Sequence, residues 1–168
     1  MKNREQRLTD TTREIFALIE TILVSLFIAC LVFTYIFRLA TIKGESMCNT
    51  LQPGDRVVFT TWYGEPEQGD IVIINADQSV TFTENGEISS RPGIEKTIVK
   101  RIIAVEGQTI DINFVRGMVT VDGKMLDEKY IKELTHTDGG AFTGMYPLTV
   151  PEGYVFVMGD NRNRSKDS

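Results

Sequence analysis

The hydrophobic residues of this chain are distributed in two different ways. From Ile15 to Phe37 the sequence is almost continuously apolar, and Glu20 is the only charged residue in that stretch. About 20 apolar residues span the hydrocarbon core of a bilayer. The stretch therefore predicts a transmembrane helix, with Glu20 near the cytoplasmic interface or against a partner. A helix buried in a soluble core would show a polar face, and residues 22–37 show almost none.

A cleaved secretory signal is the other interpretation of this stretch. Such a signal has a shorter apolar region and a small-x-small cleavage site, which the sequence Arg-Leu-Ala-Thr-Ile-Lys after Phe37 matches poorly. We therefore expect an uncleaved anchor in the cell membrane. Basic residues flank it unequally, with Lys2, Arg4, Arg7 and Arg13 before it and Arg38 and Lys43 after it. Because basic flanks stay inside, we expect residues 1–14 in the cytoplasm, 15–37 across the bilayer and 38–168 outside the cytoplasm.

Beyond the anchor, the apolar residues fall in short alternating runs that are typical of strands. The predicted strands cover residues 56–63, 70–74, 97–105, 109–114, 118–121, 148–150 and 154–158. Gly-containing pairs such as Asn85-Gly86 and Asp122-Gly123 are turn signals, and Asn85-Gly86 is suited to closing a hairpin. No long helical period follows residue 40, so residues 38–168 predict an antiparallel β-sandwich or partly open barrel.

Composition and charge narrow the chemistry. The chain has 18 Lys+Arg against 23 Asp+Glu, and an acidic domain argues against nucleic acid as a partner. Cys30 and Cys48 show no metal-ligand spacing, and the single histidine, His136, lies in a polar stretch that predicts a solvated loop. A Ser-His-Asp triad and a glycine-rich phosphate loop are therefore not expected, nor is any metal or organic cofactor.

Lys100 is unusual because it interrupts an apolar strand. On the alternating pattern alone, its side chain could face either solvent or the interior. If it faces inward, burial disfavours the charged ammonium, and a neutral amine could take a proton from a serine hydroxyl, as in Ser-Lys catalysis. Ser46, in Gly44-Glu45-Ser46-Met47, is a candidate nucleophile but a weak signal by itself.

Several motifs resemble type I signal peptidases, in the family's order and after a single anchor. Ser46-Met47-Cys48-Asn49-Thr50-Leu51, followed by Gly54-Asp55, resembles the nucleophile motif S-M-x-P-T-L. Gly69-Asp70-Ile71-Val72 and Lys100-Arg101-Ile102-Ile103-Ala104 resemble the next box and the box that carries the lysine base. Residues 121–128 resemble the intervening segment, and residues 159–168 resemble the last box, G-D-N-R-x-x-S-x-D-S. The likeness covers nearly the whole chain.

The resemblance implies a role for each matching residue. Ser46 would attack the scissile carbonyl, and Lys100 would be the general base that returns the proton to the leaving amine. Gly44 lines the oxyanion site without a hydroxyl, so the Ser46 N–H would carry more of the stabilisation, and Ser165 would orient Lys100. Arg101, Asp160 and Asp167 would be structural residues near the site, with Asp160 paired to Arg101. The pocket walls would be Ile42, Met47, Leu51, Ile98 and Val99, accepting small-x-small sequences, typically Ala-x-Ala, at the end of signal peptides. The implied partners are preprotein signal peptides, the lipid bilayer and the export machinery.

Some positions depart from the family's pattern. Asn49 and Lys43 stand where prolines are usual, and Glu106 and Gln108 replace parts of a P-G-D sequence. The chain stops at Ser168, so Asp167 lacks the arginine that normally follows. These departures leave open a non-catalytic or specialised relative that assists assembly of surface proteins such as pilus subunits. A self-cleaving repressor-type Ser-Lys protease is a third interpretation, but it does not fit the anchor or the absence of a DNA-binding region.

Overall fold

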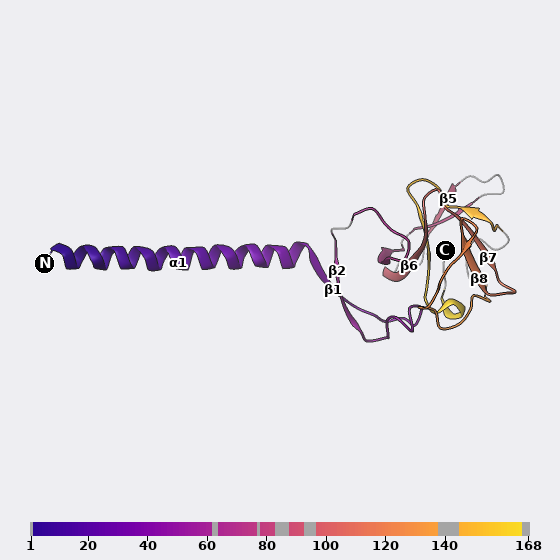
Figure 1. Cartoon of the computed structure of the whole chain (residues 1–168), viewed down its shortest axis with the longest axis horizontal. Coiled ribbons are helices and arrows are strands. Elements are labelled where there is room, and N and C mark those ends of the chain that lie inside the picture. The colour runs from indigo at the N-terminus through magenta and orange to yellow at the C-terminus, as the bar shows by residue number, and fades with distance from the viewer. Residues whose placement is uncertain are drawn as a thin grey trace. The chain divides into compact units, whose positions relative to one another are not determined.

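The N-terminal part of the chain is one long helix, drawn in indigo in Figure 1. The structure is a computed structural model that describes residues 2–61, 64–76, 78–82, 88–92, 97–137 and 145–165. Helix α1 covers Lys2–Tyr35 and contains neither glycine nor proline, which explains its continuity. Its portion Thr11–Tyr35 is long and apolar enough to cross a membrane. The helix therefore begins earlier and ends two residues sooner than the predicted membrane span of residues 15–37.

A two-stranded sheet follows the helix. Strand β1 covers Phe37–Thr41 and pairs with strand β2, Arg56–Thr60. The sequence did not predict β1, and the predicted strand at 56–63 is shorter because β2 ends at Thr60. Residues 62 and 63 lie outside the described residues. By its internal contacts the chain divides into two compact units, of which the first is Met1–Ala40 with Val57–Tyr63 and the second is Thr41–Arg56 with Gly64–Ser168.

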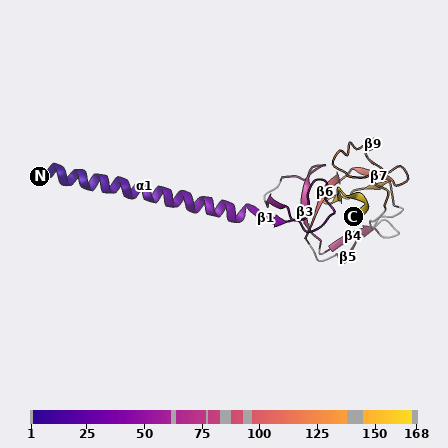
Figure 2. The same ribbon diagram turned by 90° about the horizontal axis from the view of Figure 1, so that it is seen from below.

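Within the second unit, one antiparallel sheet has the strand order β11-β6-β3. Its members are β3 (Ile71–Asn75), β6 (Thr97–Val105) and β11 (Val155–Met158). Strand β6 is central, and Arg101 lies opposite Ile71 on one side and Met158 on the other. Figure 2 shows β3 and β6 side by side. Because Arg101 pairs with Met158 at the end of β11, residues 100 and 101 lie close to the segment that follows β11.

The remaining described strands of this unit form two further antiparallel sheets. One has the order β10-β7-β8-β9, with β7 at Thr109–Asn113, β8 at Met118–Val121, β9 at Lys124–Met125 and β10 at Leu148–Thr149. The other is a hairpin of β4, Gln78–Phe82, and β5, Ile88–Pro92. The predicted Asn85-Gly86 turn would join β4 to β5, but it lies outside the described residues.

The hydrophobic core lies between the sheets that contain β6 and β7. It unites side chains from β6, β7, β8 and β11, namely Ile103, Ala104, Ile110, Ile112, Val119, Val121, Phe156 and Met158, together with Val150. The alternation of buried and exposed residues along β7 is the pattern that its sequence predicted. The predicted antiparallel β class is therefore confirmed.

Candidate active site

The candidate nucleophile lies in a tight turn, residues 45–51, which we call the serine turn. Three backbone hydrogen bonds close it, from Cys48 N to Glu45 O (3.0 Å), from Thr50 N to Met47 O (3.0 Å) and from Leu51 N to Met47 O (2.8 Å). The Met47 side chain is buried and fixes the turn to the domain, whereas Ser46 is half-buried. The turn thus holds the Ser46 side chain where solvent can still reach it.

Asn49 has an unusual backbone conformation within the serine turn. Its φ is 104°, in the region that favours glycine and that asparagine tolerates better than most residues. Proline cannot adopt this conformation, because its ring holds φ near −65°. The asparagine at this position therefore matches the turn that the structure shows.

The serine turn is bound to residues 159–165, which follow β11 and which we call the closing segment. The Asn161 backbone N–H donates to the Ser46 carbonyl at 2.9 Å, and the Asn161 side-chain amide donates to the Glu45 carbonyl at 3.0 Å. A side chain on Gly159 would come within 2.5 Å of the Ser46 carbonyl oxygen. Glycine at 159 therefore permits the close approach of the two segments.

Lys100 faces the interior, which settles the orientation that the sequence left open. The residue is only 2% exposed, and its Nζ donates a hydrogen bond to the Ser165 hydroxyl. Ser165 is itself buried, and its Cβ would lie 2.7 Å from a methyl group added at Gly159. The Ser46 backbone and the Lys100–Ser165 pair therefore lie around Gly159.

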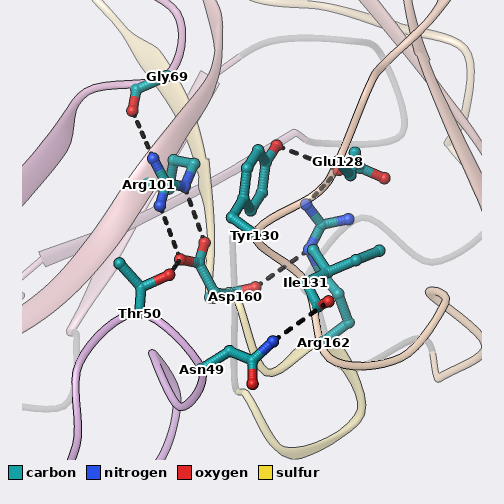
Figure 3. Close-up of polar contacts among 10 residues, drawn as sticks. Asn49, Thr50, Gly69, Arg101, Glu128, Tyr130, Ile131, Asp160 and Arg162 are labelled. Carbon is teal, nitrogen blue, oxygen red and sulfur yellow. Dashed lines mark hydrogen bonds and ion pairs between the residues drawn. The ribbon is translucent and has the colours of Figure 1, made fainter.

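Arg101, the neighbour of Lys100 on β6, forms a bidentate ion pair with Asp160 of the closing segment. Arg101 Nε and Nη2 donate to the two Asp160 carboxylate oxygens, each at 2.8 Å, and Nη1 donates to the Gly69 carbonyl at 2.8 Å. Asp160 is fully buried and also accepts a hydrogen bond from the Thr50 hydroxyl. The Asp160 carboxylate raises the pKa of the Arg101 guanidinium above its usual value. This pair joins the serine turn, strand β6 and the closing segment (Figure 3).

A second polar cluster, which sequence reasoning did not identify, surrounds Tyr130. The Arg101 guanidinium lies over the Tyr130 ring, 4.1 Å from its centre, and the Arg162 guanidinium lies 6.0 Å from that centre. The Tyr130 hydroxyl donates to Glu128 at 3.3 Å, and the same Glu128 oxygen pairs with the buried Arg162. Burial, with the Glu128 charge next in importance, raises the pKa of Tyr130 to about 12.

The profile of a known family, described as "Signal peptidase, peptidase S26", matches residues 15–168. The chain belongs to this family. It is 33% identical to a signal peptidase I of Bacillus licheniformis over 171 residues, covering 98% of this chain and 83% of the relative. It is 35% identical to thylakoidal processing peptidase 1 of Arabidopsis thaliana, over 76% of this chain and 35% of that protein. A solved signal peptidase I from Enterococcus faecalis V583 is 27% identical, with a TM-score of 0.43, over 62% of this chain and 84% of that chain.

The other residues that the signal peptidase resemblance singled out have varied placements. Ile42 is buried, Leu51, Ile98 and Val99 are half-buried, and Gly44 is exposed with open space where a side chain would be. Asp167 lies outside the described residues.

Two further observations concern a cavity and the binding of metal ions by this signal peptidase family member. An open cavity of about 510 Å³ is lined by residues 117–119, 125–129 and 131–134, and it includes none of the proposed wall residues. In the part of the chain that the structure describes, no group of three or more His, Cys, Asp or Glu residues is arranged to hold a metal ion.

His136 is exposed and belongs neither to the Arg101–Asp160 pair nor to the cluster around Tyr130. Its backbone N–H donates to the Asn163 side chain at 3.1 Å, and its Nδ1 lies 3.0 Å from the Phe114 carbonyl. His136 is therefore an exposed loop residue, as its polar surroundings in the sequence predicted.

Proposed function

We propose that this chain is a membrane-bound serine endopeptidase that removes signal peptides from exported preproteins by a Ser46–Lys100 dyad. Membership of the signal peptidase family supports the peptidase activity. The observation that carries the mechanism is the burial of Lys100 with its Nζ on the Ser165 hydroxyl. A lysine that serves only solubility would extend into water, whereas this one is held beside the segment that binds the Ser46 backbone.

In the proposed reaction, the Ser46 hydroxyl oxygen attacks the scissile carbonyl while Lys100 Nζ accepts its proton. The negative charge that forms on the carbonyl oxygen is stabilised by the Ser46 backbone N–H, since Gly44 offers no hydroxyl. Lys100 then gives the proton to the leaving amine, and water releases the acyl group from Ser46. Ser165 fixes the lysine side chain, because its hydroxyl accepts a hydrogen bond from Lys100 Nζ.

The proposed specificity is cleavage after small-x-small sequences, typically Ala-x-Ala. Its walls would come from the serine turn and strand β6, where the half-buried Leu51, Ile98 and Val99 present apolar surface. Ile42 and Met47 are already buried by the protein and would support those walls from behind. Apolar walls with little depth favour small side chains because larger ones would leave apolar surface in water.

The proposed topology places the N-terminus in the cytoplasm and residues 38–168 outside it. The excess of basic residues before the apolar part of α1 supports this orientation. Signal peptides leave the bilayer on that outer side, so attachment to the membrane would bring enzyme and substrate together. Protease added outside intact protoplasts should digest residues 38–168, and protection of that region would contradict the topology.

Cleavage of a purified preprotein by the full chain in detergent micelles tests the mechanism. Ser46→Ala and Lys100→Ala should each abolish cleavage without unfolding the protein, and undiminished cleavage by either would refute the dyad. Lys124→Ala is the matched control, because it removes an exposed lysine and should leave the rate unchanged. Covalent labelling of Ser46 by a serine-directed penem or lipopeptide probe separates the enzyme from a non-catalytic assembly factor, which would not be labelled.

A further inference from the structure

Tyr130 connects the half-buried Arg101 with the buried Arg162. The Arg101 guanidinium stacks on its ring at 4.1 Å, and its hydroxyl binds Glu128, which in turn pairs with Arg162. Figure 3 shows the ring between the two guanidinium groups. Tyr130 is half-buried, and because its contacts are with Arg101, Arg162 and Glu128, its effect on the site would pass through the arginines.

We propose that Tyr130 is a positioning residue for the Ser46–Lys100 chemistry, acting through Arg101. This inference rests on the proposed function. A cation over an aromatic face is held in a preferred place by the charge distribution of the ring. The Arg101 side chain is 11% exposed, so little water competes for this contact. The ring thus fixes the orientation in which Arg101 donates to both Asp160 oxygens.

Asp160 transmits this orientation to the nucleophile. Its carboxylate accepts a hydrogen bond from Thr50 in the serine turn, and the next residue, Asn161, donates its N–H to the Ser46 carbonyl. A tilted Arg101 would pull the Asp160 carboxylate away from Thr50. Because Asp160 is fully buried, no water would replace the lost bonds.

Arg101 also transmits the orientation to the base. It is the neighbour of Lys100 on β6, and neighbouring residues of a strand share one rigid backbone while their side chains point to opposite faces. Arg101 therefore holds the closing segment from one face of β6 at Asp160, and Lys100 contacts it from the other at Ser165.

The hydroxyl of Tyr130 has a smaller part in the arrangement. It shares a Glu128 oxygen with Arg162, whose Nε donates to the Gly159 carbonyl at 3.0 Å. Arg162 Nη1 also donates a hydrogen bond to the Thr135 hydroxyl at 2.8 Å, so the position of the Arg162 side chain does not depend on Tyr130 alone. The ring face, rather than the hydroxyl, is therefore the part of Tyr130 that the site needs.

The test compares Tyr130→Leu with Tyr130→Phe in the full chain, using a preprotein with an Ala-x-Ala cleavage site. Tyr130→Leu removes the ring and should lower kcat roughly tenfold, with KM within about twofold of wild type. Tyr130→Phe keeps the ring and should retain kcat. Phe114→Leu is the matched control, because it removes another half-buried ring of the same unit and should lower stability without changing kcat.

A double-variant comparison tests the route through Arg101. Arg101→Lys breaks the bidentate pair, so combining it with Tyr130→Leu should reduce kcat little more than the larger single effect. Independent effects that multiply, an unchanged kcat in Tyr130→Leu, or an equal loss in Phe114→Leu would each overturn the proposal. If Tyr130→Leu does not fold, Tyr130→Met also removes the ring while keeping a long apolar side chain, and an unchanged kcat for that variant would also overturn the proposal.

The outcome separates this inference from the proposed function. Wild-type protein that cleaves no preprotein and reacts with no serine probe would remove both proposals. Wild-type protein that cleaves, loses activity in Ser46→Ala and retains it in Tyr130→Leu would remove only the positioning role of Tyr130.

Discussion

Replacing Asn49 by proline should destabilise this protein, although proline is the residue that the family usually has at this position. The backbone at Asn49 has φ of 104°, and proline would impose a value near −65°. The serine turn would have to open, which would break the bonds of Thr50 N and Leu51 N to the Met47 carbonyl. It would also remove the Thr50 hydroxyl from the buried Asp160 carboxylate. At about 1 kcal/mol for each backbone bond and about 2 kcal/mol for the bond to the carboxylate, the expected loss is about 4 kcal/mol.

Glycine and alanine at the same position provide the comparison. Asn49→Gly relieves the cost of a positive φ but makes the unfolded chain more flexible, so the two effects should cancel to within about 0.5 kcal/mol. Asn49→Ala keeps a Cβ without the tolerance of asparagine for this conformation, and it should lose about 1 kcal/mol. Urea denaturation of the full chain in detergent micelles, followed by circular dichroism, measures all three variants. A proline variant as stable as wild type would refute the reasoning, because it would show that the turn does not need a positive φ.

Three further predictions concern the polar clusters and the close approach at Gly159. Arg101→Met leaves the buried Asp160 charge unpaired and should lower the free energy of unfolding by about 3–5 kcal/mol in the same denaturation assay; a loss below about 1 kcal/mol would contradict the burial of this pair. Tyr130 should ionise near pH 12, later than an ordinary tyrosine near pH 10, so absorbance at 295 nm should show a late step that Tyr130→Phe lacks. Because the folded state holds this proton more firmly, stability should fall as pH rises from about 10 to 12, and less so in Tyr130→Phe. Gly159→Ala should abolish cleavage through a clash with the serine turn at 2.5 Å, whereas Gly64→Ala, where the added methyl meets nothing within 4 Å, should be neutral; equal activity of the two would show that the turn can move aside.

The parts of the fold that the sequence predicted well are those with a strong local pattern. Strand β6 has the predicted bounds, residues 97–105, because a long apolar run between polar segments has one stable arrangement at the centre of a sheet. Strand β8 likewise covers the predicted residues 118–121. Strand β1 was missed because its residues 37–41 continue the apolar composition of α1 without a glycine or proline to separate them. Its pairing with β2 depends on a partner that follows the serine turn, which no local pattern indicates.

The residues of the candidate site also differ in how well the sequence predicted them. The motifs indicated Ser46, Lys100 and Ser165, and the structure brings these residues around Gly159. The sequence could not decide whether Lys100 faces inward, since one lysine in an apolar strand fits either face. Tyr130 had no comparable signal, and Arg162 lay in the last box, G-D-N-R, without an implied role, because a tyrosine and an arginine in polar segments usually lie at the surface. The burial of Arg162 and the half-burial of Tyr130 follow from tertiary packing.

The hydrogen bonds between the serine turn and the closing segment also have a consequence for when the enzyme forms during its synthesis. Asp160 binds a residue 110 positions earlier in the chain, and Asn161 binds one 116 positions earlier. A chain is synthesised from its N-terminus, and contacts so distant in sequence require a long loop to close before they form. While β3 and β6 emerge, the serine turn has no closing segment to bind, and Lys100 has no Ser165. The proposed nucleophile and base can therefore come together only after residues 159–165 have been synthesised, so a chain that lacks this segment has no assembled site of this kind.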